Sequence, residues 1–209
     1  MPLVTSKEML LKAQQGGYAV GAFNAENMEM VKAIIQAAEE LKAPVMIQTT
    51  PSTVKYGTLE TYQAIVAAEA AKASVPVCLH LDHGSSFELA VQAINAGYTS
   101  VMIDGSGLPF EENIAVTKKV VDVAEAVGIP VEAELGKVGG KEDDLEAEAD
   151  KYTDPEEAKE FEERTGIWVD VVSGGTNELL QRIQQEADAP KADVMFGGGV
   201  ESLESYQDC

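Results

Sequence analysis

Alternating strand and helix patterns restrict the fold of this chain more than any other feature of its sequence. Apolar strand segments lie at residues 18–24, 45–50, 77–82, 99–104, 129–135, 167–172 and 192–196. Each is followed by a segment whose apolar residues recur at helical spacing, which gives seven βα units. Alternation of this kind predicts a parallel sheet with right-handed crossover connections.

Seven βα units favour a TIM-barrel-like α/β domain, in which a parallel sheet curls until its first and last strands meet. The 209-residue sequence is one unit short of an eight-stranded barrel and below its usual length of about 250 residues. An open doubly wound sheet is the alternative. We expect one domain over residues 1–209. We also expect the sheet edge left unpaired by the absent strand to be covered, either in a homo-oligomer or by a terminus of the chain.

Net charge excludes more functions than any other feature of the composition. The formal net charge is −21, so the chain offers no basic surface to the phosphates of nucleic acid or to an anionic membrane. No apolar run approaches the ~20 residues of a membrane-spanning helix, and the N-terminus lacks a signal pattern. We expect a cytoplasmic protein that binds neither nucleic acids nor membranes.

Polar residues cluster where the third predicted strand ends. His80, Asp82, His83 and Gly84 lie at the end of residues 77–82, directly before a predicted helix. Parallel α/β proteins place their chemistry at this end of the strands. An aspartate beside a histidine provides a proton-transfer group and a metal ligand within one loop. Ordinary strand and loop roles are the alternative, but the clustering favours chemistry.

Three local predictions concern the surroundings of this cluster. The pattern predicts a single helix over residues 58–73 and a long loop over residues 136–153. It also predicts a helix that begins at Pro155, with Asp154 as its N-cap. The fourth predicted strand ends in an acid, Asp104, so a second polar side chain is expected at the same edge of the sheet.

Five short motifs occur in the first 166 residues: Ala22-Phe-Asn24, Leu79-His-Leu-Asp-His-Gly84, Met102-Ile-Asp104, Val131-Glu-Ala-Glu-Leu-Gly136 and Gly139-Gly-Lys-Glu-Asp143. Together, and in this order, they resemble class II fructose-bisphosphate aldolase. The resemblance implies a TIM barrel and, in the parent family, zinc-dependent cleavage of the phosphosugar fructose 1,6-bisphosphate.

The resemblance also implies metal-binding roles. His83 would be a zinc ligand, and Glu134 would be either a ligand or a carboxylate close behind the ligands. Asp104 would orient one of the ligands. Zinc would act as a Lewis acid on the substrate.

Proton transfer and substrate binding fall to other residues by the same resemblance. Asp82 would donate and accept the proton at the hydroxyl group of the cleaved bond. Glu142, on a mobile loop, would help to move the proton at the carbon next to the carbonyl, and Asn24 would contact the substrate. From the residues alone, a surface or capping role is the alternative for each carboxylate, most strongly for Glu142 in its acidic loop.

The last part of the chain resembles another family. Two segments, Ile167-Trp-Val-Asp-Val-Val-Ser-Gly-Gly-Thr-Asn-Glu-Leu-Leu180 and Ala192-Asp-Val-Met-Phe-Gly-Gly-Gly-Val-Glu-Ser-Leu203, are similar to the N-terminal lobe of ABC-importer periplasmic solute-binding proteins of the ferric-iron-binding type. Both families are expected to share a helix that ends as residues 161–167 do. We therefore expect an engineered chimera of an aldolase fragment, 1–166, and a binding-protein fragment, 167–209.

This junction determines the expected function. The aldolase resemblance implies two further histidine ligands after residue 166, whereas His80 and His83 are the only histidines in the sequence. We expect zinc binding to be weak or absent and catalysis to be inefficient. One alternative is a residual metal-dependent aldolase that cleaves fructose 1,6-bisphosphate. Another is a module that binds an anion or an iron ligand.

A glycine-rich turn bears on the anion-binding alternative. It consists of Ser173, Gly174, Gly175 and Thr176. Backbone N–H groups at a helix N-terminus can hold an anion. The simpler interpretation is that glycine permits a tight strand-to-helix turn, and we favour it because the turn fits neither a P-loop nor a dinucleotide fingerprint.

Overall fold

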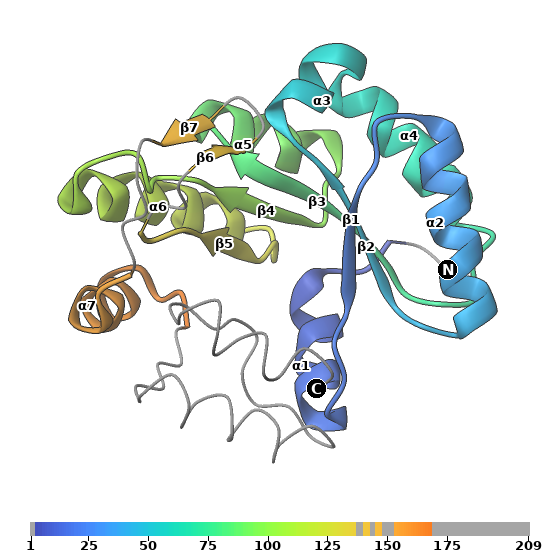
Figure 1. Ribbon diagram of the computed structural model, residues 1–209, viewed down its shortest axis with the longest axis horizontal. Helices are drawn as coiled ribbons and strands as arrows, with labels where there is room; N and C mark the ends of the chain where they lie inside the picture. The colour runs from blue at the N-terminus through green and yellow to red at the C-terminus, as the bar shows by residue number, and fades with distance from the viewer. Residues whose placement is uncertain (1–2, 137–139, 143–144, 148–152, 169–209) are drawn as a thin grey trace.

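The computed structural model describes residues 3–136, 140–142, 145–147 and 153–168. Within this part of the chain, parallel strands form one five-stranded sheet (Figure 1). The strands are β1 (Gly21–Asn24), β2 (Val45–Thr49), β3 (Val77–Gly84), β4 (Ser100–Ile103) and β5 (Val131–Ala133). They lie in the sheet in the order of the sequence. The predicted parallel α/β class is confirmed, and the sequential order matches a barrel wall, since a doubly wound sheet reverses its strand order.

The last two predicted βα units lie almost entirely beyond residue 168, outside the described residues. The assignment of residues 1–209 to a single domain therefore stays a prediction, as does the homo-oligomer formed through an unpaired edge. Within the described ranges, no helix is both long enough and apolar enough to cross a membrane.

Helices connect the strands and cover one face of the sheet. Their bounds are α1 (Ser6–Gly16), α2 (Met28–Leu41), α3 (Pro51–Gly57), α4 (Leu59–Ala70), α5 (Phe87–Ala96), α6 (Phe110–Glu125) and α7 (Pro155–Thr165). A separate antiparallel pair consists of β6 (Gly140–Glu142) and β7 (Leu145–Ala147). Figure 1 shows α2, α4, α5 and α6 around the outside of the sheet and α1 near the start of β1.

The central strand β3 is buried on both of its faces. Its odd-numbered side chains, Val77, Leu79 and Leu81, belong to the main apolar core together with residues of the outer helices. On the opposite face, Cys78 packs against Met9 of α1. This double burial explains why β3 reads as a continuous apolar run rather than as an alternating one.

One of the three local predictions needs correction. The helix predicted over 58–73 is present as α4, which has Thr58 as its N-cap and ends at Ala70. The preceding helix α3 was not predicted. The segment predicted as a loop over 136–153 contains β6 and β7. The start of α7 is confirmed, since the Asp154 side chain accepts hydrogen bonds from the backbone N–H groups of Glu156 and Glu157.

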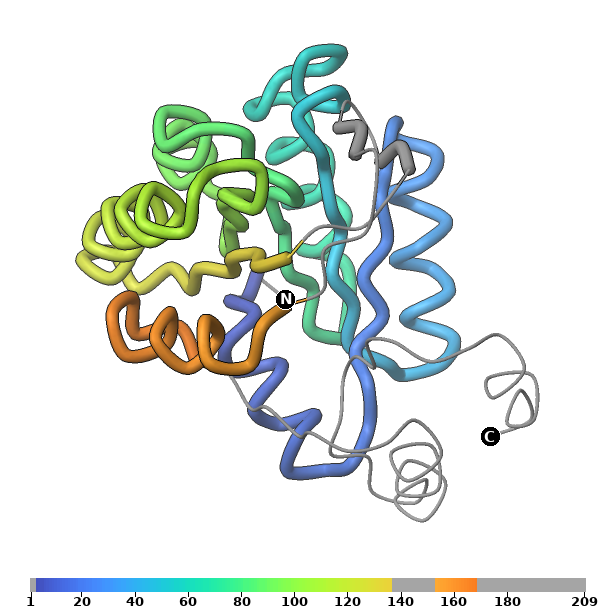
Figure 2. The backbone as a smooth tube through the Cα atoms, turned by 60° about the vertical axis from the view of Figure 1, so that its left-hand side comes forward, coloured from blue at the N-terminus to red at the C-terminus, as the bar shows by residue number. Residues whose placement is uncertain are grey.

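Helix α7 returns the chain to the sheet after the β6–β7 excursion. The Thr153 hydroxyl donates to the Leu135 carbonyl at 2.9 Å, so the excursion begins and ends at one place. Both terminal nitrogens of Arg164 donate to the carboxylate of Glu111 in α6, at 2.8 and 2.6 Å. Figure 2 shows α7 beside α6. The two ends of this excursion therefore meet close to the C-terminal end of β5.

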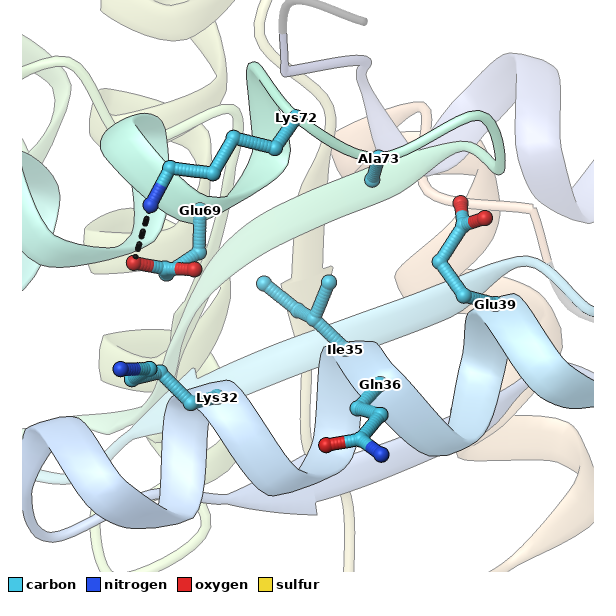
Figure 3. Close-up of a pocket in the computed structure, with 7 residues that line it drawn as sticks. All are labelled: Lys32, Ile35, Gln36, Glu39, Glu69, Lys72 and Ala73. Atoms are coloured by element: carbon cyan, nitrogen blue, oxygen red, sulfur yellow. Dashed lines mark hydrogen bonds and ion pairs between the residues drawn. The ribbon is translucent and has the colours of Figure 1, made fainter.

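A carboxylate on α2 holds the turn that leads into β3. Glu39 accepts hydrogen bonds from the backbone N–H groups of Ser74 and Val75 and from the Ser74 hydroxyl. Figure 3 shows Glu39 on the wall of a groove between α2 and α4, on the helical face of the protein. The hydrogen bond from Val75, followed by those from Ser74, lowers the pKa of Glu39 to about 2.

We expect Glu39→Gln to lower the melting temperature at pH 7. The lowered pKa means that Glu39 stabilises the fold above pH 4.5, and that this contribution is lost as the pH falls through about 2. The difference between wild type and variant should therefore shrink over this window in thermal melts. Glu40→Gln is the matched control, since Glu40 accepts from Gln36 on the same helix. A difference that does not change with pH would contradict the prediction.

Candidate metal centre

An extra residue in β3 shapes the end of this strand. Leu81 pairs with Val101, but the next pair joins Gly84 to Ile103, so three steps along β3 match two along β4. The irregularity lies at Asp82 and His83. Successive side chains of a regular strand point to opposite faces, and a bulge re-aims one of them.

His83 takes the unusual backbone conformation that this bulge requires. Its φ is 47°, in a region that residues other than glycine seldom adopt. The next residue must be small, because a Cβ atom on Gly84 would lie 2.2 Å from the carbonyl oxygen of Met102. Close approach of β3 and β4 at Gly84 therefore fixes where the bulge ends.

Side chains from three strands meet at this end of the sheet. The Nδ1 atom of His83 lies 3.1 Å from Oδ2 of Asp104 and 3.6 Å from Oε2 of Glu134. Asp104 directly follows β4, and Glu134 directly follows β5. Their side chains are 5% and 23% exposed, and that of His83 is 14% exposed. The three therefore form a partly buried cluster at the C-terminal edge.

Asp104 is held in its charged form. Burial alone would raise its pKa, but hydrogen bonds from His83 and Ser106 outweigh burial and lower the pKa below its usual range. The Ser106 hydroxyl donates to Oδ1 at 2.7 Å and the Ser106 backbone N–H at 3.0 Å. Because Oδ1 is held by Ser106, Oδ2 faces the His83 ring.

The spacing of these donors suits a divalent metal ion. One ligand atom from each of His83, Asp104 and Glu134 lies within 4.8 Å of the others. Around zinc, ligand atoms at 2.0–2.2 Å in a tetrahedral arrangement lie roughly 3.3–3.6 Å apart. The separations of the Asp104 and Glu134 oxygens from Nδ1 of His83, 3.1 and 3.6 Å, are close to this range. Imidazole nitrogen and carboxylate oxygen are also donors that zinc accepts.

His80 lies in the interior and belongs to a different set of contacts. Its Nδ1 atom is 2.8 Å from the hydroxyl of Ser100, which lies 2.9 Å from the hydroxyl of Ser6 in α1. Its Nε2 atom is 3.6 Å from the carboxylate of Glu132. Burial, and then the nearby charge of His83, lower the pKa of His80 to about 4. Of the two histidines, His83 alone therefore faces Asp104 and Glu134.

The other candidate residues differ in what the structure describes of them. Asp82 is partly buried in the bulge, and Asn24 is exposed at the C-terminal end of β1. For Glu142, only the backbone is described, as part of β6. The turn formed by Ser173, Gly174, Gly175 and Thr176 lies outside the described residues. The roles expected for all these residues stay predictions.

Two residues that shape the cluster were not among the residues predicted from the sequence. Ser106 holds one oxygen of Asp104, and Asn113 of α6 donates to the carbonyl of Glu134 at 2.8 Å. A serine two residues after an aspartate is a common turn pattern that could have indicated the first contact. The second joins a helix to a strand end, and no local pattern predicts it.

Comparison with known proteins identifies the family. A family model described as fructose-bisphosphate aldolase class-II matches residues 4–195. The chain belongs to the class II fructose-bisphosphate aldolase family. A probable fructose-bisphosphate aldolase of Bacillus subtilis (strain 168) is 55% identical over 170 residues, which cover 80% of this chain and 60% of that protein. A fructose-bisphosphate aldolase of Staphylococcus aureus (strain Mu50) is 49% identical over 172 residues.

Solved structures agree with this assignment. The YdjI aldolase from Escherichia coli K12 matches with a TM-score of 0.70 and 41% identity, over 78% of this chain and 59% of that one. A putative fructose-1,6-biphosphate aldolase from Coccidioides immitis matches with a TM-score of 0.72 and 32% identity, over 88% and 70% of the two chains. The chain spans about 60% of the length of the curated aldolases it matches.

The family match overturns the predicted chimera. It continues to residue 195, past the junction that was placed before Ile167. The prediction of an engineered chimera with a ferric-iron-binding fragment is therefore wrong, and the expectation of a scaffold without efficient catalysis is corrected with it. A strand followed by a glycine-rich turn and a helix is common to many α/β proteins, so the resemblance of residues 167–209 to binding proteins rested on a pattern of low specificity.

We expect the His80 ring to stay neutral in the folded, metal-free protein down to about pH 5. Its pKa is lowered from 6.5 to about 4, whereas the unfolded chain takes up the proton near pH 6.5. Stability should therefore fall by roughly 2–4 kcal/mol as the pH falls from 6.5 to 4. NMR titration of the two histidines checks the pKa, and His80→Gln should remove this part of the pH dependence. A His80 signal that titrates near pH 6.5 would contradict the assignment.

Proposed function

We propose that this chain is a metal-dependent aldehyde-lyase that cleaves fructose 1,6-bisphosphate, with zinc held by His83, Asp104 and Glu134. The observation that carries the proposal is the meeting of one imidazole and two carboxylates from three strands. Family membership supports zinc as the metal and a phosphosugar as the substrate. Bound zinc would supply Lewis-acid stabilisation of negative charge on the substrate.

The three donors are sufficient in number for a catalytic site. Catalytic zinc sites use about three protein ligands and keep one position open. His83, Asp104 and Glu134 provide three donors although the sequence has only two histidines. Asp104 and Glu134 lie against the same ring nitrogen of His83, so a metal ion bound to that nitrogen would be within reach of both carboxylates.

Asp82 is the residue that we propose for proton transfer. It precedes His83 within the bulge, so its carboxylate is carried by the same irregular turn as the metal-binding ring. There it would take the proton from the substrate hydroxyl during cleavage and return it during condensation. Asn24, at the same edge on β1, would contact the substrate, and Glu142 on β6 would assist at the neighbouring carbon.

The first test compares two glutamates on one strand. We expect Glu134→Gln to weaken zinc binding by roughly 10²-fold or more, because loss of a ligand costs at least as much as loss of a residue that supports one. Glu132→Gln is the matched control: it makes the same chemical change two residues earlier and outside the cluster. Isothermal titration with zinc measures both affinities. Equal affinities for the two variants would contradict the proposed ligand set.

The second test separates proton transfer from metal binding. We expect Asp82→Asn to lower kcat for fructose 1,6-bisphosphate cleavage by roughly 10²–10⁴-fold, while zinc affinity stays at the wild-type value. A coupled assay of triose phosphate release measures the rate, with chelation and zinc restoration as the metal control. Zinc-loaded wild type without activity would overturn the proposed reaction. A variant with wild-type kcat would remove Asp82 from it.

A further inference from the structure

One buried amide touches the backbone behind both carboxylates of the cluster. Asn113 lies in the first half of α6 and is 2% exposed. Its Nδ2 atom donates to the backbone carbonyl of Glu134 at 2.8 Å. Its Oδ1 atom accepts from the hydroxyl of Thr117 at 3.2 Å, one helical turn further on. The hydrogen bond from Thr117 therefore fixes which end of the amide faces Glu134.

The same side chain packs against the residue that follows Asp104. A Cβ atom built on Gly105 would lie 2.1 Å from Oδ1 and 2.6 Å from Cγ of Asn113. Glycine at 105 is thus the condition for Asn113 to occupy its position. One side chain thereby contacts both the loop that carries Asp104 and the loop that carries Glu134.

An apolar side chain would fill this space at a lower free-energy cost of burial. Burying an amide is unfavourable unless its polar atoms are hydrogen-bonded, and the net gain from such bonds is small. What the amide adds is direction, since its NH₂ group fixes the backbone at the residue whose side chain faces His83. Residues behind metal ligands commonly act in this way.

We propose that Asn113 is a positioning residue that sets the separation between the Asp104 and Glu134 carboxylates and so determines the affinity of the site for a divalent metal ion. The inference rests on the proposed function, because it concerns the same metal centre. It extends that function by assigning a role to a side chain that touches neither metal nor substrate.

The experiment measures metal affinity and stability separately in the full chain. Zinc affinity is measured by competition with a chromophoric chelator, the cobalt(II) absorption spectrum reports ligand geometry, and thermal melts of the metal-free proteins report stability. We expect Asn113→Ala to weaken zinc binding about tenfold and to change the cobalt spectrum. Gly105→Ala should do the same, because its methyl group would displace Asn113.

The double variant shows whether the two changes act through one contact. If Gly105 matters only by making room for Asn113, then Gly105→Ala should add less than about twofold in zinc affinity to Asn113→Ala, as expected for coupled neighbours. If the fold losses in zinc affinity of the two single variants multiply in the double variant, Gly105 acts independently of Asn113. That result would count against the proposal.

Two threonines supply a matched control in case Asn113→Ala folds poorly. Thr117 and Thr49 are both fully buried, and each makes one side-chain hydrogen bond, Thr49 with the Tyr98 hydroxyl at 2.8 Å. Thr117→Val and Thr49→Val should lower the melting temperature by similar amounts. Thr117→Val alone should also weaken zinc binding, by roughly two- to fivefold, because it frees the amide that supports a ligand.

The outcomes distinguish this inference from the proposed function. Wild type that binds neither zinc nor cobalt(II) would overturn the proposed function and the inference together. Wild type that binds zinc, with Asn113→Ala and Thr117→Val within twofold of it, would overturn the inference alone. Melting temperatures that fall while affinity stays constant would then show that Asn113 only stabilises the fold.

Discussion

The close approach of β3 and β4 at Gly84 is the constraint on which the candidate site depends. With no room for a side chain beneath the Met102 carbonyl, the two strands come together again only after β3 has accommodated one extra residue. That residue turns the His83 ring toward Asp104 and Glu134. In a strand without the bulge, Asp82 and His83 would face opposite sides of the wall, and proton transfer and metal binding would be separated.

The wall beneath this edge is organised in layers along the strands. Apolar side chains of β3 pack outward against the helices, and Met9 of α1 packs against Cys78 on the inner face. Above them, His80 and Ser100 form a buried polar layer in which the histidine is kept neutral. Asp104 and Glu134 lie in the last layer, where both side chains are partly exposed. This gradient follows from the cost of burying charge without a partner.

Much of this arrangement could be predicted from the sequence. Alternation of strand and helix patterns gave the parallel sheet, and the position of Asp82, His83 and Asp104 at strand ends gave the edge where they meet. These features are local, since each depends on residues close together in the chain. The helix α3 was missed because its seven residues are too few to show a helical apolar period. The β6–β7 pair was missed because its polar composition is typical of a loop.

Features set by contacts between distant segments could not be predicted. The bulge depends on the register of β3 against β4, and Asn113 reaches Glu134 only after α6 has packed beside β5. The chimera prediction failed for a different reason. It gave a short and common turn pattern more weight than the specificity of that pattern allows.

The most direct test of the proposed metal ligands is X-ray absorption at the zinc K-edge of the zinc-loaded chain. The account predicts one imidazole and oxygen donors at about 2.0–2.2 Å. A spectrum without imidazole, or with sulfur at about 2.3 Å, would contradict it.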